Sequence, residues 1–249
     1  MSPKSLNTLC DMIDLARIKL DDLREVTDLQ GSNLEILQEA AEGTDESALL
    51  WTDNELILYA NQAVAEVAER ANVVGDRGTI DGLTRFSVLA GATDFIALSD
   101  RFISVRRVYW DGKPIGRAYE DRLASEYSDW QARTGTPHSF VLDTTTREIR
   151  PFPAPEQDGT LTLDVITRPL TDMADMDDVP PIPVRLREGA INWICHLAYL
   201  KNDADTHDPQ KAERFEALFA RQFGDRPSAN TLECRFDQAQ RHRPRLVWF

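Results

Sequence analysis

The sequence has few cysteines, and their arrangement suggests neither a disulfide framework nor a zinc site. Three cysteines, Cys10, Cys195 and Cys234, are scattered among 249 residues. They form no CxxC pair and no cluster with histidine at metal-ligand spacing. No run approaches the roughly 18 apolar residues that a membrane span needs, and the first residues lack the apolar core of a signal peptide. We therefore expect a protein of a reducing, aqueous compartment with no membrane contact.

Catalytic sequence motifs are also missing. The sequence has no serine nucleophile elbow, no Walker loop and no dinucleotide-binding glycine pattern. None of the four histidines (His138, His196, His207 and His242) has a sequence neighbour that suggests a triad or a metal face. His196 falls in an apolar helical stretch, where a packed or hydrogen-bonded histidine is the expected role. We predict no catalytic residue, no cofactor and no metal.

The most metal-like segment is Asp-Ala-Asp-Thr-His-Asp at residues 203–208. Its alternating aspartates resemble the start of a calcium loop, but the glycine and the distal glutamate of an EF-hand are missing. A junction between two helices explains the same residues, with Asp208 as an N-cap and Pro209 in the first helical position. We favour the junction.

The charge of the chain is strongly negative, with a net value of −14 and a sequence pI of about 4.7. Such a surface repels phosphate backbones, so sequence-independent nucleic-acid binding lacks its usual electrostatic source. The acidity serves either solubility alone or a surface that nucleic acid passes without adhering. Apolar residues at 42% and charged residues at 28% are ordinary for a folded globular protein.

Helical periodicity occurs near both ends of the chain. The first predicted helix covers residues 6–20 with Ser5 as N-cap, and the second starts at a capping box, Thr52 to Glu55, and ends before Gly75. A third helix follows a proline-rich approach and includes residues 186–200. A fourth begins at residue 209 and stops at Gly224.

The middle of the chain is rich in β-branched and aromatic residues. Strands are predicted at 94–98, 102–110, 139–143, 148–151 and 160–167, with a hairpin turn at 111–112 and a short helix within 119–130. The predicted fold class is therefore α+β: a four-helix bundle with a β-rich module inserted between helices 2 and 3, and an extended C-terminal arm. The predicted bundle comprises residues 1–78 and 180–224, the inserted module 79–179, and the arm 225–249.

The C-terminal residues are unusual for the tail of an acidic protein, because a cationic run precedes four apolar residues. Arginine and large apolar side chains are typical of binding hot spots. Two interpretations stay open: the tail folds back onto its own acidic body, or it docks on a different protein or a neighbouring subunit. The predicted protein-binding residues are Arg241, Arg243, Arg245, Leu246, Val247, Trp248 and Phe249.

From about residue 95 to 225 the chain resembles the head-to-tail adaptor (connector) proteins of tailed bacteriophages. The resemblance depends on the order and spacing of several short motifs. They are Trp130 with Gly135-Thr136-Pro137, Pro151-Phe152-Pro153-Ala154-Pro155, Pro180-Pro181-Ile182-Pro183 before Ala190 and Trp193, and residues 203–209 before Ala212 and Phe215.

The resemblance implies a structural virion protein at the head–tail junction, assembled in the host cytoplasm. Copies are expected to form a ring, a dodecamer by family analogy, beneath the portal protein. The ring extends the DNA channel without binding the genomic DNA specifically, and it offers a docking surface to tail proteins such as a nozzle or tail-tube component. An extended C-terminal segment inserts into the outer surface of the portal.

Two alternatives remain from the sequence. The first is a tail-completion or nozzle-like ring component that binds tail proteins only. The second is a virion-associated hydrolase, which would require His196, His207 and Asp203 to converge in a cleft.

Overall fold

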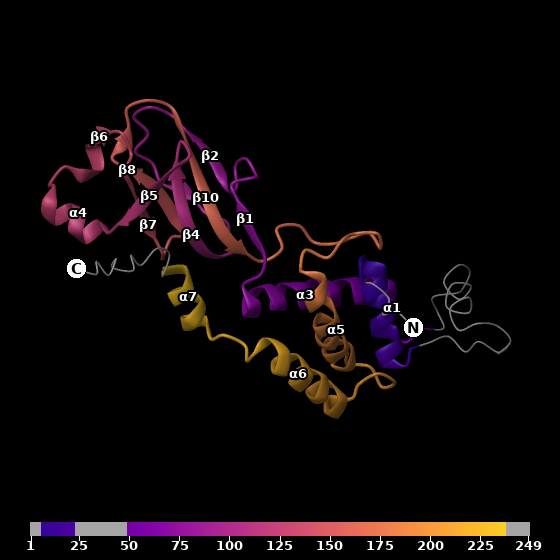
Figure 1. Ribbon diagram of the computed structural model, residues 1–249. Coiled ribbons are helices and arrows are strands. Elements are labelled where there is room, and N and C mark those ends of the chain that lie inside the picture. Colours follow the sequence, from indigo (N-terminus) through magenta and orange to yellow (C-terminus); the bar gives the residue numbers. More distant parts are fainter. Residues whose placement is uncertain (1–5, 23–48, 238–249) are drawn as a thin grey trace, which may run out of the picture. The chain divides into compact units, whose positions relative to one another are not determined.

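The structure is a computed structural model that describes residues 6–22 and 49–237. The chain forms two compact units (Figure 1). Unit 1 comprises residues 1–71 and 171–226, and unit 2 comprises residues 72–170 and 227–249. Helices dominate unit 1, whereas a sheet dominates unit 2, so the predicted α+β class is confirmed.

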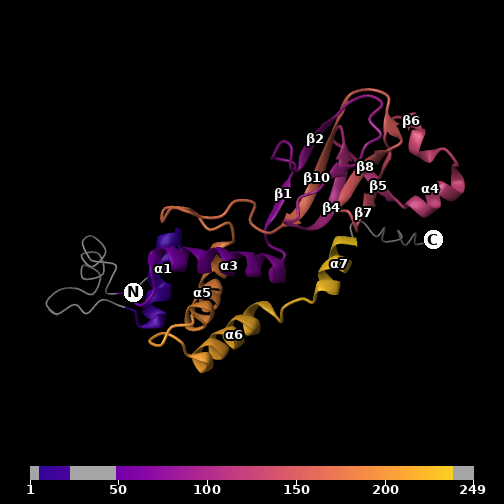
Figure 2. The same cartoon turned by 180° about the vertical axis from the view of Figure 1, so that it is seen from behind.

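Unit 1 contains the helices α1 (Leu9–Leu20), α3 (Asp53–Ala71), α5 (Val184–Tyr199) and α6 (Pro209–Phe223). Helix α5 contacts the other three, and Figures 1 and 2 show it beside α3 and α6 from opposite sides. Its inward face consists of small and branched side chains that are fully buried, which permits close packing. These are Ala190, Ile191, Ile194, Cys195 and Ala198.

Local sequence signals set the starts of these helices. The capping box at the start of α3 is confirmed: the Thr52 amide donates to Glu55, and the Glu55 amide donates to the Thr52 hydroxyl at 3.3 Å. The predicted start of the first helix was wrong, because α1 begins at Leu9 with Thr8 as its N-cap. Thr8 and Asp11 form a second capping box that satisfies the amides of the first turn.

Arg187 fixes the beginning of α5 to the segments beside it. Its guanidinium is buried and donates to four backbone carbonyls. The acceptors are Leu6 (2.6 Å), Asn7 (2.8 Å), Pro180 (2.8 Å) and Ile182 (3.0 Å). One side chain thereby ties the approach to α1 and the proline-rich loop to α5.

Arg70, near the end of α3, joins three parts of unit 1. It donates to Glu66 at 2.8 Å and to the carbonyl of Gly224, which follows α6, at 2.7 Å. Its guanidinium lies 5.0 Å from the ring centre of Trp193 and 4.8 Å from that of Phe219. Arg70 and Glu66 are both buried, so their pairing compensates two desolvated charges, and the more exposed Arg226 lies 3.7 Å from Glu66 as a further partner.

Unit 2 is built on an eight-stranded mixed sheet in the order β1-β10-β4-β5-β7-β8-β3, with β2 also paired to β10. Only the β5–β7 pair within this sheet is parallel. A separate pair consists of β6 (Thr134–Gly135) and β9 (Ala154–Pro155). The strands of the large sheet are β1 (Gly75–Arg77), β2 (Arg85–Val88), β3 (Ile96–Ala97), β4 (Phe102–Trp110), β5 (Lys113–Ala118), β7 (Ser139–Asp143), β8 (Glu148–Phe152) and β10 (Gly159–Thr167).

The predicted hairpin and the predicted faces of β10 are confirmed. Asp111 and Gly112 both have positive φ, 45° and 76°, as a two-residue turn between twisted antiparallel strands requires. Leu161, Leu163 and Val165 alternate along β10 and are fully buried in the core of unit 2.

Two helices complete unit 2: α4 (Glu120–Glu126), within the range predicted to be helical, and α7 (Ala229–Asp237). A short 3-10 helix, Trp130–Ala132, follows α4. Four of the six described α-helices thus belong to unit 1. Their arrangement as a regular four-helix bundle with an inserted β module stays a prediction.

Candidate binding surfaces

The predicted docking residues lie outside the described part of the chain. Arg241, Arg243, Arg245 and the residues 246–249 all follow residue 237, the last that the structure describes. The structure therefore leaves both interpretations of this tail open. It does show how the chain approaches the tail, because α7 ends at residue 237.

The start of the predicted arm was assigned wrongly as extended. Residues 229–237 form α7, which packs against β4. Phe236 is 1% exposed within the core of unit 2, and the Arg147 guanidinium lies 4.2 Å from its ring centre. The chain is therefore anchored to the sheet immediately before the predicted docking residues.

A sequence signal for α7 was available. Ser228 precedes the helix, and its hydroxyl accepts a hydrogen bond from the Thr231 amide at 3.2 Å, as an N-cap does. Leu232 and Phe236 are separated by four residues and so lie on one face of the helix. The helix has only nine residues, and its burial depends on the sheet, so periodicity alone gave a weak indication.

A second candidate surface is the solvent-facing side of the sheet around β10. Cross-strand pairing places Arg85, Thr162 and Tyr109 in one row, and Arg77, Asp164 and Arg107 in the next. All six side chains line two adjoining open hollows on this side of the sheet. Adjacent rows on one face bring these side chains within reach of one another.

A β-bulge adds a further arginine to this surface. Along β4, Arg107 lies opposite Asp164, but Val105 lies opposite Val165, so Arg106 is an extra residue in the ladder. As a result Arg106 and Arg107, although consecutive, are both exposed. We call the exposed arginines Arg77, Arg85, Arg106 and Arg107 the arginine face.

The loop between β1 and β2 is fixed by Asp76. Its carboxylate accepts hydrogen bonds from the Thr79 amide at 3.0 Å and from the hydroxyls of Thr79 and Thr84. Burial raises the pKa of Asp76, but these hydrogen bonds outweigh burial and hold the pKa below its ordinary value. The bonds join β1 to the turn before β2, the two strands that carry Arg77 and Arg85.

The arginine face is basic relative to the rest of the protein. The two hollows are lined by five arginines, those of the arginine face and Arg235 from α7, against two carboxylates, Asp111 and Asp164. Arg77 pairs with Asp164 at 3.9 Å, and the Arg77 side chain is 82% exposed. Such a pair is well solvated and leaves most of the arginine available to a partner.

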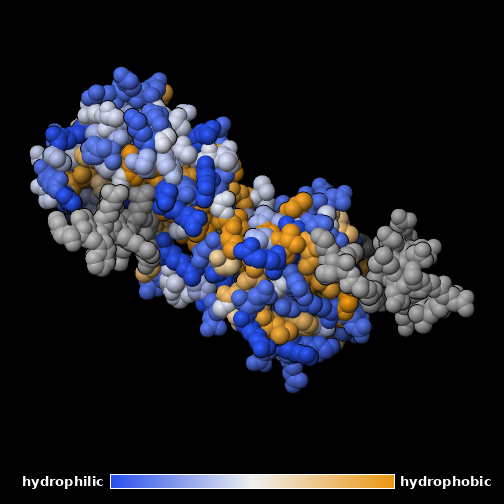
Figure 3. All heavy atoms as spheres, in the orientation of Figure 1, coloured by the Kyte–Doolittle hydropathy of each residue, from blue (hydrophilic) through white to orange (hydrophobic). Residues whose placement is uncertain are grey.

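The negative charge of the chain belongs entirely to unit 1. That unit contains 12 lysines and arginines against 26 aspartates and glutamates, a net charge of −14. Unit 2 contains 16 of each kind and has a net charge of zero. Figure 3 shows predominantly hydrophilic colours on the visible face of unit 2, whereas hydrophobic patches are more extensive over unit 1.

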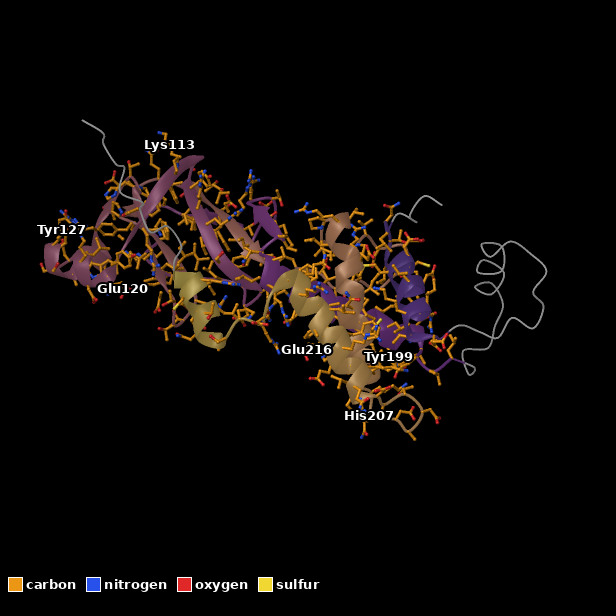
Figure 4. The ribbon with its side chains drawn as sticks, turned by 60° about the horizontal axis from the view of Figure 1, so that its bottom comes forward. Lys113, Glu120, Tyr127, Tyr199, His207 and Glu216 are labelled. Atoms are coloured by element: carbon orange, nitrogen blue, oxygen red, sulfur yellow. The ribbon has the colours of Figure 1, made fainter. Side chains whose placement is uncertain are left out.

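Of the residues weighed as hydrolase candidates, His196 is buried in α5, whereas Asp203 and His207 are exposed in the turn between α5 and α6. The buried His196 has its Nδ1 2.9 Å from the Ala212 carbonyl, which confirms the predicted packed histidine. Asp208 is the N-cap of α6 and accepts from the Lys211 amide at 3.0 Å, which confirms the helix junction. His207 is exposed and points away from the helices in Figure 4.

Within residues 6–22 and 49–237, no group of three or more His, Cys, Asp or Glu side chains is placed to hold a metal ion. None of the helices described in these ranges has both the length and the apolar character to cross a membrane. The features that stand out are therefore surfaces: an acidic helical unit, a basic sheet face and a chain end anchored by α7.

The structure thus combines an acidic helical unit with a sheet unit that carries a basic face. The family of the SU10 adaptor protein matches residues 12–245, which includes both units. The chain belongs to this family of phage adaptor proteins, and it is a structural component of the virion. No curated protein matches it.

Proposed function

We propose that the chain is a head-to-tail adaptor whose copies form a ring beneath the portal protein. In this role the ring extends the DNA channel at the head–tail junction and provides the surface on which tail proteins dock. The observation that carries the proposal is the family match over residues 12–245, because it extends across the helical unit, the sheet unit and α7.

The distribution of charge supports the channel role. Unit 1 carries the whole net charge of −14. A wall of that sign repels the phosphate backbone, so duplex DNA slides past it without adhering. Genomic DNA is then a passing cargo and not a bound ligand.

The anchoring of α7 supports a docking role for the residues that follow it. Phe236 holds the helix in the core of unit 2, so the next residues begin at a fixed point on the adaptor. A tethered segment binds its target at high effective concentration, and ring symmetry repeats the contact on every subunit. We propose that residues 241–249 insert into the portal and attach the ring to it.

The experiment is native mass spectrometry of the full chain, alone and mixed with the portal ring encoded in the same genome. The proposal expects the adaptor to join the portal in ring stoichiometry, with twelve copies on a twelvefold portal by family analogy. Absence of association with the portal, together with binding to tail proteins, would instead favour the tail-component alternative.

A truncated chain tests the docking segment. Deletion of residues 238–249 keeps α7 and every described residue of both units, so we expect an unchanged melting temperature and loss of portal binding. The matched control replaces Gln238 and Gln240 by alanine, which keeps the basic and apolar residues and should bind like the parent chain. Unchanged portal binding by the truncated chain would refute the docking role.

A further inference from the structure

We propose that the arginine face of one copy binds the acidic helical unit of the next copy, and that this head-to-tail contact joins neighbouring subunits. The inference rests on the proposed ring, and it identifies the two surfaces that would form the subunit interface. Neither surface includes residues 238–249.

The arginine face has the composition of an interface. Arg85, Arg106 and Arg107 are exposed, Arg77 is 82% exposed, and the half-buried ring of Tyr109 lies between the two hollows. Arginine and tyrosine are enriched at protein interfaces, because both combine apolar contact area with directional hydrogen bonding. Guanidinium groups also form paired hydrogen bonds with carboxylates.

The complementary surface lies on the same chain. The loop of residues 171–179 contains four aspartates and no basic residue, and its Asp175 and Asp177 are exposed. A separate acidic turn, at the other end of α5, carries the exposed Asp203 and Asp205. A protomer that carries both a basic and an acidic surface can form a heterologous contact, in which different patches of two copies meet and closure gives a ring.

A carboxylate partner fits this face better than a phosphate backbone does. Asp164 lies between Arg77 and Arg107 in the cross-strand register, and Asp111 lies at the rim of one hollow. Both carboxylates repel any anionic partner, and they repel the dense charge of a phosphate backbone most. The net charge of −14 opposes a second copy as well as DNA, but duplex DNA carries roughly one negative charge per 1.7 Å of its axis, whereas the second copy spreads 26 acidic and 12 basic residues over unit 1.

The test is sedimentation velocity of the full chain without portal, over a range of concentrations in low and in moderate salt. We expect association that rises with concentration and weakens with salt, because charges on an exposed face are screened beyond about 10 Å at 0.1 M. The double substitution Arg106→Glu and Arg107→Glu should weaken association on the order of tenfold or more, since it places like charges opposite each other. The double substitution Arg77→Glu and Arg85→Glu, on β1 and β2, should weaken association in the same way.

Mixing the parent chain with an arginine-to-glutamate variant distinguishes a head-to-tail contact from other kinds of contact. The variant keeps its acidic unit 1, so this unit should still bind the arginine face of a parent chain. Its own glutamate-substituted face cannot bind a further copy, so the variant should stop the oligomer from growing at that end. The control replaces Arg122 and Arg133 by glutamate. Both are exposed in unit 2, at residues that line neither hollow, and the control should associate like the parent. Melting temperatures close to that of the parent show that each variant is folded.

Several results would overturn the inference: a parent chain that stays monomeric at low salt, association that both arginine variants leave unchanged, or a variant that fails to cap parent chains. Binding of duplex DNA that the arginine variants abolish, without self-association, would assign the face to nucleic acid instead. Because portal is absent from this experiment, failure here is distinct from failure of portal attachment.

Discussion

Substitution of Phe236 by alanine tests whether α7 is held to the sheet by one side chain. Of residues 229–236, for which exposure is described, Phe236 alone is buried. It packs with residues of β4 and other strands in the core of unit 2, and Arg147 covers its ring at 4.2 Å. A nine-residue helix is marginal by itself in water, so α7 depends on this contact.

The expected loss follows from burial and the ring contact. Replacing a fully buried phenylalanine by alanine costs about 3–5 kcal/mol in unfolding free energy. The cation–π contact with Arg147 contributes roughly 0.5–1 kcal/mol within that loss. Burial of a phenylalanine side chain contributes about 1.5–3 kcal/mol to folding. The loss expected for the substitution is therefore at least as large as the free energy with which this ring holds α7 on the sheet. We therefore expect α7 to detach while the helices of unit 1 keep their stability.

Hydrogen exchange followed by mass spectrometry measures this separately for each segment. Peptides of α7 should lose protection in Phe236→Ala, peptides of β4 should lose part of theirs, and peptides of α3 should not change. The control is Asn230→Ala, an exposed change on the same helix that raises helix propensity slightly. Unchanged protection of α7, with a stability loss below about 1 kcal/mol, would refute the single-anchor reasoning.

The remaining predictions concern buried and partly buried charges of unit 1. Arg70→Met should lower the unfolding free energy by about 3 kcal/mol in urea titrations, because buried Glu66 loses its partner at 2.8 Å and keeps only the largely exposed Arg226 at 3.7 Å. A second prediction concerns Glu55. Burial raises the pKa of Glu55, but the hydrogen bond and charge of Lys201 and the capping bonds from Thr52 lower this pKa below its ordinary value of 4.5. Its stabilising contribution is therefore fully present above pH 4.5 and is lost as the pH falls through the lowered pKa.

Matched measurements separate these effects from general destabilisation. Arg122→Met breaks a fully solvated pair with Glu126 and should leave the urea midpoint nearly unchanged, so an equally small effect of Arg70→Met would contradict the burial argument. For Glu55, urea midpoints of the parent and Glu55→Gln are compared at pH 7 and pH 3.5. The urea midpoints of the two proteins should differ less at pH 3.5 than at pH 7. A larger difference at pH 3.5 would contradict the predicted pH dependence.

The elements that the sequence predicted well carry their own local signals. The capping box at residue 52, the proline-led α6 and the Asp111–Gly112 turn each depend on residues within four positions of one another. The strand at 160–167, which is β10 without Gly159, was predicted because polar and apolar residues alternate from Thr160 to Val165. In each case the free energy that selects the structure is local, so the sequence pattern is sufficient.

The elements that the sequence missed depend on distant partners. β1 and β2 have three and four residues, and both exist as strands because they pair with β10, more than 70 residues further along the chain. β3 is two residues long, shorter than the predicted 94–98, and it pairs with β8. Helix α7 likewise requires the pocket that Phe236 fills.

The same division applies to the surfaces. The chain's total acidity and the composition of residues 241–249 are properties of the sequence, and they were sufficient to predict a binding protein. The arginine face was not predictable, because its residues come from three strands and a bulge whose register is set only when β10 pairs on both sides. By itself the sequence determined the charge, the capped helices, the hairpin and the family. The tertiary structure decided which charges share a face and where the chain end is anchored, since cross-strand pairing and burial join residues that are far apart in the sequence.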